Sequence, residues 1–216
     1  KYSVLRAFSD RRDPQRLLAG LGERFGTTEL AYKMHASVAF SHPALDALQE
    51  LVEGGLTSAE VASVELRFPT SGYHVIDDNP LRSHCAQYLI ALMLTRGVIR
   101  FSDVVHDRTV DDPEVARLRA ATTVVPDDEL DRTYPELYRT VLTVRTTAGR
   151  DIIRDVTHPL GTPENPVGEE ELRAKFDRLV VPVLGDDRAA ELSAAVLGID
   201  RAPDVDGLLS ATVAPS

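Results

Sequence analysis

The chain has 216 residues, of which 43% are hydrophobic and 27% are charged, so it can form one large domain or two small ones around a sizeable core. Its net charge of −10 argues against nucleic acid or an anionic membrane as a partner, since both repel negative charge. Cys85 is the only cysteine, which excludes an internal disulfide, an iron–sulfur cluster and a CxxC zinc site.

The sequence shows neither a membrane-spanning segment nor a signal peptide. No apolar run approaches the roughly 18 residues of a membrane-spanning helix. Lys1-Tyr2-Ser3 does not begin the charged-then-apolar pattern of a signal peptide. We therefore expect a cytoplasmic protein, and because the chain does not begin with Met, we also expect that sequence precedes it.

The first elements are two predicted helices. Asp13-Pro14 predicts a helix start, because aspartate caps helix N-termini and proline suits the first turn. This helix extends to residue 25, and its apolar face holds Leu17, Leu18, Leu21 and Phe25. His42-Pro43 opens the second helix, which Gly54-Gly55 ends. Residues 27–41 have no clear period and are predicted to form a loop or a short strand.

The rest of the chain alternates between predicted strands and helices. Residues 61–68 read as a half-buried strand, with Ala62, Val64, Leu66 and Phe68 on one side. The remaining predicted helices cover 82–96, 113–121, 169–180, 187–197 and 204–210, and the remaining predicted strands cover 122–125, 138–146 and 151–156. Helices flanking a small antiparallel sheet make the fold class α+β.

Several motifs follow one another in a fixed order along most of the chain. Lys33 is followed nine residues later by His42 and then by Asp46-Ala47. The other motifs are Leu21-Gly22-Glu23-Arg24-Phe25, Arg82 to Tyr88, Gly161-x-Pro163-x-Asn165-Pro166 and Lys175-Phe176. In order and spacing they resemble the MmgE/PrpD family, which includes 2-methylcitrate dehydratase, cis-aconitate decarboxylase and related isomerases or epimerases of small polycarboxylates.

The resemblance implies a domain organisation. Residues 1–28 would be the end of an all-helical domain or a linker, 29–166 a lid domain, and 167–216 the C-terminal helices that return to the helical domain. Family members are longer than this chain, so a helical domain would have to come from the same protein or from a separate polypeptide. We expect a homodimer or a heteromer with a helical-domain polypeptide, because an uncovered lid domain would expose the apolar face that the helical domain covers.

The resemblance also implies a site for a small polycarboxylate substrate, with no metal or other cofactor. Lys33 is expected to contact a carboxylate or to transfer a proton, and it is one of only three lysines among 24 basic residues. Tyr73 would donate or protonate through its phenol, as a site tyrosine of the decarboxylase branch does. His84 would add positive charge at the start of the predicted helix 82–96, where backbone amides favour anions.

Three further residues are expected to bind substrate: His42, Cys85 and Gly161. Each has a structural alternative. His42 can serve the start of a helix, Cys85 can be a buried inert thiol, and Gly161 can be required by a turn. A metal pair of His35 and His42 lacks a third ligand nearby in the sequence.

Three functions remain open at this point. The first is part of a metal-independent, 2-methylcitrate dehydratase-like lyase. The second is a cis-aconitate decarboxylase-like enzyme, or an epimerase or isomerase, on the same scaffold. The third is a non-catalytic binding or interaction domain derived from the family. It is favoured by His35 in place of the family's aromatic residue, by Cys85 in place of its serine, and by the helical domain that these residues do not include.

Overall fold

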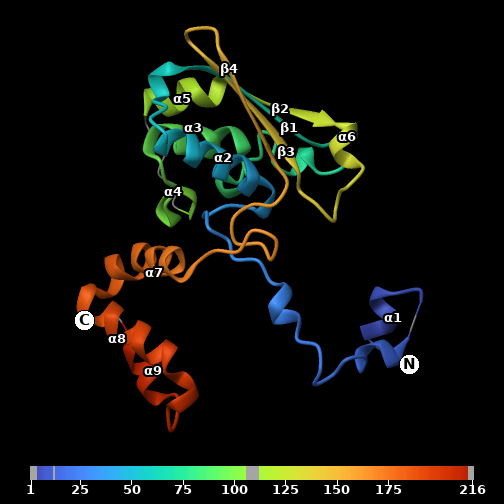
Figure 1. The fold of residues 1–216 in the computed structure, drawn as a ribbon, viewed down its shortest axis with the longest axis vertical. Coiled ribbons are helices and arrows are strands. Elements are labelled where there is room, and N and C mark those ends of the chain that lie inside the picture. The colour runs from blue at the N-terminus through green and yellow to red at the C-terminus, as the bar shows by residue number, and fades with distance from the viewer. Residues whose placement is uncertain (1–3, 12, 106–111, 214–216) are drawn as a thin grey trace.

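The structure is a computed structural model that describes residues 4–11, 13–105 and 112–213. Its centre is a four-stranded sheet with the strand order β2-β1-β3-β4 (Figure 1). The strands are β1 (Val61–Pro69), β2 (Thr122–Asp127), β3 (Thr140–Thr146) and β4 (Asp151–Val156). The predicted α+β class is confirmed.

The expectation of an antiparallel sheet is wrong for one of the three strand pairs. β3 pairs antiparallel with both β1 and β4, but β2 runs parallel to β1. The chain reaches β2 from β1 through a helical crossover, and a parallel pair requires a crossover of this kind. The sheet is therefore mixed.

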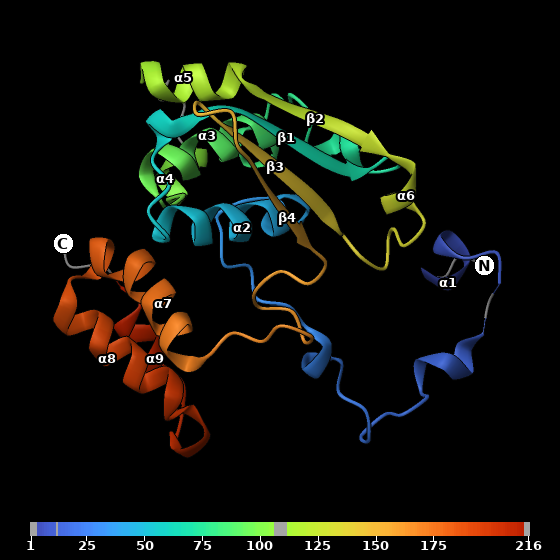
Figure 2. The same cartoon turned by 45° about the horizontal axis from the view of Figure 1, so that its top comes forward.

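Helices cover one face of the sheet. The α-helices are α1 (Val4–Phe8), α2 (His42–Glu53), α3 (Ala86–Arg96), α4 (Phe101–Val105), α5 (Pro113–Ala120), α6 (Asp128–Asp131), α7 (Glu169–Leu184), α8 (Asp186–Leu197) and α9 (Asp206–Ala211). α2 packs on β3 and β4, and α3 packs on β2 (Figure 2). Leu45 and Leu48 of α2 are fully buried, as the apolar stripe of that predicted helix requires.

The alternation predicted for β1 holds along most of the strand. Val64, Leu66 and Phe68 are buried, but Ala62 is exposed and Val61 is fully buried. The register with β3 shifts between Val61 and Ser63, as at a β-bulge. One irregular residue reverses the side to which the preceding residues point, so the strict period of two fails at the strand start.

The predicted helix 82–96 divides into two parts. Arg82–His84 forms a 3-10 turn, and α3 begins at Ala86 after Cys85, whose backbone is extended. Almost every residue of α3 is buried, because the helix lies between the sheet, α2 and α5. It ends at Gly97, whose left-handed φ of 68° closes the helix.

The predicted helix 13–25 is wrong. A single 3-10 turn, Pro14–Leu17, follows the Asp13 cap, and Gly20 and Gly22 adopt positive φ. Large apolar side chains of this segment are exposed: Leu17, Leu18, Leu21 and Phe25. An amphipathic helix is stabilised mainly by packing of its apolar face, and within the described residues this face has no such packing.

The C-terminal helices α7, α8 and α9 pack on one another around a small separate core. Its buried residues are Leu184, Leu192 and Ala211, joined by the half-buried Phe176 and Leu208. Both views show this group set apart from the sheet and its helices, at the end of residues 157–168 (Figures 1 and 2). Within the described ranges no helix is long and apolar enough to cross a membrane.

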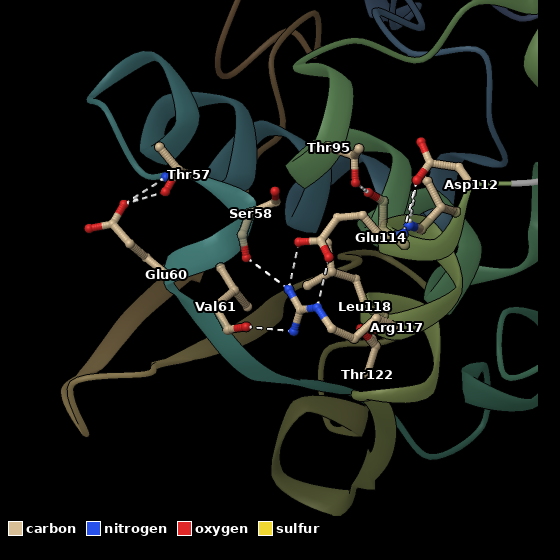
Figure 3. A network of polar contacts seen from close by, with 12 residues as sticks. Thr57, Ser58, Glu60, Val61, Thr95, Asp112, Glu114, Arg117, Leu118 and Thr122 are labelled. Carbon is tan, nitrogen blue, oxygen red and sulfur yellow. Dashed lines mark hydrogen bonds and ion pairs between the residues drawn. The ribbon is translucent and has the colours of Figure 1, made fainter.

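A polar network fastens α5 to the start of β1 (Figure 3). Arg117 donates to the carbonyls of Ser58 and Val61, both at 2.9 Å, and pairs with both carboxylate oxygens of Glu114. This hydrogen bonding with Arg117 lowers the pKa of Glu114 to about 2. The planar guanidinium thus ties α5 to the start of β1. Lysine could not replace it, because its single ammonium lacks the forked arrangement of donors.

Candidate functional site

A hollow of about 350 Å³ lies between the loop before α2 and the segment before α3. Its lining consists of Lys33, His35, Ala36, Ser37, Val38, Ser83, His84, Phe101, Val104 and Val105. The amide of Val38 donates to the carbonyl of Ser83 at 2.8 Å, which fastens the two walls to each other. Three segments, the loop before α2, the turn before α3 and α4, therefore form one concave surface.

The structure brings Lys33 and His84 to this hollow. Lys33 is exposed, and its Nζ lies 3.4 Å from the carbonyl oxygen of Ser37. His84 is half-buried in the 3-10 turn before α3, with its Nδ1 3.0 Å from the Ser83 hydroxyl. A lysine amine and an imidazole that line one hollow can hold carboxylate groups of a bound ligand or exchange a proton with it.

A hydrogen-bonded pair of His35 and Asp46, mostly shielded from solvent, lies beside the Lys33 loop. His35 Nε2 is 2.7 Å from Asp46 Oδ1, and the other Asp46 oxygen accepts the Leu160 amide at 2.7 Å. The His35 side chain is 6% exposed and that of Asp46 15%, so water screens this pair weakly. Sequence reasoning missed the role of Asp46, although the motif that starts at Lys33 contains this aspartate.

His42, the first residue of α2, is buried beneath the same loop. Its ring packs edge-on against His35 with centroids 5.2 Å apart, and its Nε2 has no hydrogen-bond partner among the described residues. The pKa of His42 is lowered to about 4, mainly by burial and secondly by the charge of His35, while Asp46 acts in the opposite direction. His42 is therefore neutral near pH 7.

Tyr73 lies outside this group. It begins the 3-10 turn Tyr73–Val75 after β1, where its half-buried ring packs against the main core. It is absent from the lining of the hollow that holds Lys33 and His84. The structure therefore does not bring Tyr73 together with the other two residues expected to be catalytic.

Cys85 faces a different hollow. It is 2% exposed and lines a space of about 640 Å³ between the turn at Asp78 and α5, together with Arg82 and Arg119. Burial raises the pKa of its thiol, so the reactive thiolate is disfavoured at neutral pH. The observed setting agrees with the inert-thiol alternative stated above.

Gly161 supports the Lys33 loop through its backbone. Its carbonyl accepts the Tyr32 amide at 2.8 Å, and its own amide donates to Asn165 at 2.8 Å. Its φ is +96°, and a Cβ at this position would lie 2.4 Å from the Tyr32 carbonyl oxygen. Glycine is required here by the close approach of two backbones. Among the described residues, no three His, Cys, Asp or Glu side chains gather as a metal site.

Comparison with known proteins places the chain among relatives that are longer than it is. Residues 35–201 match the family model of the MmgE/PrpD C-terminal domain, which confirms the resemblance drawn from the motifs. The chain is 24% identical over 212 residues to a cis-aconitate decarboxylase of Aspergillus terreus, which covers 90% of this chain and 43% of that protein.

Two dehydratases match over shorter stretches. A 2-methylcitrate dehydratase of Cupriavidus necator is 30% identical over 141 residues, covering 61% of this chain and 28% of that protein. The mitochondrial 2-methylcitrate dehydratase of Yarrowia lipolytica is 32% identical over 92 residues, covering 40% and 18%. The chain thus spans less than half the length of these relatives.

Replacing Gly161 by Ala is expected to destabilise the fold more than the same change at Gly149. Gly149 also has positive φ, +79°, but no heavy atom lies within 4 Å of the Cβ that Ala would add there. Gly149→Ala should cost about 1 kcal/mol from backbone strain, and Gly161→Ala at least roughly 1 kcal/mol more because the Tyr32 carbonyl must move. Urea unfolding measures both. Equal losses would contradict a steric requirement at Gly161.

Stability is expected to fall as His42 is forced to accept a proton. Its folded pKa of about 4 lies below the ordinary 6.5, so its contribution is complete above pH 6.5 and is lost as pH falls towards 4. The loss attributable to this group is up to about 3 kcal/mol. The free energy of unfolding, measured by urea at several pH values between 4 and 6.5, should fall less with decreasing pH for His42→Gln than for the parent chain.

The exposed His74 provides the matched control for this measurement. His74→Gln should retain the pH slope of the parent chain, because replacing an exposed imidazole removes no buried group. Identical slopes for the two variants would show that burial of His42 does not control the acid sensitivity of the fold.

Proposed function

Because the chain belongs to the MmgE/PrpD family, we propose that it forms the carboxylate-holding part of a metal-independent lyase that acts on a small polycarboxylate. The juxtaposition of Lys33 and His84 around one hollow carries this proposal. Such a substrate is a polyanion with an acidic C–H next to a carboxylate. Its conversion needs positive charge to hold it and a group that moves one proton.

In the first form of the proposal the reaction is the dehydration of a 2-methylcitrate-like acid. A base removes the proton next to a carboxylate, and the hydroxyl group leaves with a proton as water. Lys33 holds a carboxylate or transfers the proton, and His84 contributes a further donor in the lining of the same hollow. Because His42 is neutral, it does not add a second positive charge near the Lys33 amine. His42, Cys85 and Gly161 stay proposed substrate-binding positions, of which Gly161 would act through its backbone.

A second form is the decarboxylation of a cis-aconitate-like acid, in which carbon dioxide leaves and a proton is added to the carbon that held it. One observation favours it: the match to the Aspergillus terreus decarboxylase spans 90% of this chain, against 61% for the Cupriavidus necator dehydratase. Tyr73 would be the proton donor in this form. Because Tyr73 does not line the hollow, this form requires that another part of the protein bring the substrate into contact with its phenol.

The substrate form is tested by following 2-methylcitrate, citrate, cis-aconitate and iminodisuccinate with the native protein by proton NMR. Loss of water from 2-methylcitrate supports the dehydratase, and carbon dioxide release from cis-aconitate supports the decarboxylase. Replacing Lys33 by Ala should lower the turnover of the accepted acid on the order of 100-fold, because it removes a charged contact to the reacting anion.

Lys175→Ala is the matched control, since Lys175 lies on α7 away from the hollow. It should turn over substrate within about twofold of the parent protein, as expected for a residue outside the site. Parent-like turnover by Lys33→Ala would exclude the role of Lys33. Saturable carboxylate binding without turnover of any acid would favour the non-catalytic binding domain.

We also propose that a helical polypeptide corresponding to the remaining length of the relatives covers both ends of this chain. Exposed apolar side chains gather there: Leu17, Leu18, Leu21 and Phe25 in the N-terminal segment, and Val183, Leu197, Leu209 and Val213 in the C-terminal helices. Exposed apolar surface of this extent is typical of an interface. This polypeptide belongs either to the same protein or to a separate subunit; the alternative is a homodimer, in which a second copy of this chain covers the ends.

Native mass spectrometry of the protein from its own source tests this association. We expect a mass well above the 23.7 kDa of this chain, because the apolar ends need a cover. A second polypeptide, a longer chain or a dimer would each give such a mass and can be told apart under denaturing conditions. A lone 23.7 kDa species at high concentration would contradict the proposed cover.

A further inference from the structure

The two loops beside Lys33 are joined through the carboxylate of Asp46, whose side chain is 15% exposed. Asp46, on the first turns of α2, contacts His35 Nε2 with one oxygen and accepts the Leu160 amide with the other, both at 2.7 Å. Charge-assisted hydrogen bonds of this length are stronger than neutral ones, and burial strengthens them further. Asp46 therefore connects the loop before α2 to the loop after β4.

A second hydrogen bond holds the backbone on the other side of Lys33. The Tyr32 amide donates to the Gly161 carbonyl at 2.8 Å, and Gly161 directly follows Leu160. Lys33 lies between Tyr32 and His35, so its backbone is held on both sides. One side is fastened to Gly161 and the other to Asp46. Neither connection is part of a helix or a sheet, and residues 30–38 have no regular secondary structure of their own.

We propose that Asp46 is a positioning residue for Lys33, a role that rests on the proposed function of Lys33 in substrate binding or proton transfer. The Lys33 side chain is long and exposed, and its only described polar contact is to the Ser37 carbonyl at 3.4 Å. The place of its amine therefore depends on the path of the loop backbone, and Asp46 fixes that path. A displacement of about 1 Å at a reacting group can cost on the order of 100-fold in rate.

The alternative is that Asp46 only stabilises the fold. The two roles differ in whether the loss depends on Lys33. If Asp46 acts through Lys33, removing Asp46 has little further effect once Lys33 is gone. If Asp46 is only structural, Asp46→Ala costs the same whether or not Lys33 is present.

The experiment is a double-mutant cycle on the native protein, with turnover of the accepted polycarboxylate as one measurement. Asp46→Ala is expected to lower kcat/KM about tenfold or more in the parent protein, and about twofold or less in the Lys33→Ala background. Glu50→Ala, an exposed carboxylate on the same helix, should leave both backgrounds unchanged. Equal losses in the two backgrounds would overturn the proposal.

The second measurement does not need activity. With lysine labelled with carbon-13 at the ε position, the Lys33 signal can be assigned by its absence in Lys33→Arg. We expect Asp46→Ala to move this signal towards that of free lysine and to leave the Lys175 signal in place. An unmoved Lys33 signal would overturn the proposal. A moved signal in a protein that converts none of the four acids would support the positioning contact while the proposed function fails.

Asp46→Asn provides the measurement if Asp46→Ala does not fold. An asparagine oxygen can still accept the Leu160 amide, but it lacks the charge that pairs with His35. We expect this variant to show a smaller change of the Lys33 signal in the same direction, and a signal identical to the parent's would count against the role of Asp46. His35→Phe removes the His35 contact alone and should reproduce the effect of Asp46→Asn.

Discussion

The carboxylate of Asp46 is the contact on which the arrangement of the hollow depends. It stands on a helix that is firmly packed through Leu45 and Leu48, and it reaches two loops that have no regular structure. The Asp46 side chain is only 15% exposed, so losing either hydrogen-bond partner would leave a poorly solvated charge and is costly. The rigid part of the protein thereby determines the course of the loop that carries Lys33.

The same region concentrates buried polar groups at the start of α2. His35, Ser37, Ser41 and His42 are all nearly inaccessible to solvent, and Ser41 contacts the Ser37 hydroxyl and the Val38 carbonyl. Buried polar groups are usually fully hydrogen-bonded, and the unpaired His42 Nε2 departs from this rule. Arg188 Nε on α8 is also unpaired within the described part of the chain, so the unpaired His42 atom does not by itself mark a site.

Both ends of the chain, unlike the region around the hollow, leave apolar side chains exposed to solvent. The sheet and its helices bury a continuous core, whereas the N-terminal segment and the outer faces of α7, α8 and α9 expose large apolar side chains. The motif around Leu21 predicted a helix because its apolar residues recur at helical spacing. Periodicity shows which residues could form an apolar helix face, but a short helix is stable only when that face is packed, and among the described residues nothing packs against it.

The sequence by itself determined the fold class and most element positions, because apolar periodicity and caps are local properties. Its motifs carried the resemblance to the family, and from that resemblance came the proposal of Lys33 and His84 as site residues. The sequence also contained Asp46 and Gly161 within motifs. Only the tertiary structure decided the parallel pairing of β2, the bulge at Val61, the separation of Tyr73 and Cys85 from Lys33, and the contact from Asp46 to Leu160. These depend on contacts between residues far apart in the chain, which no local pattern specifies.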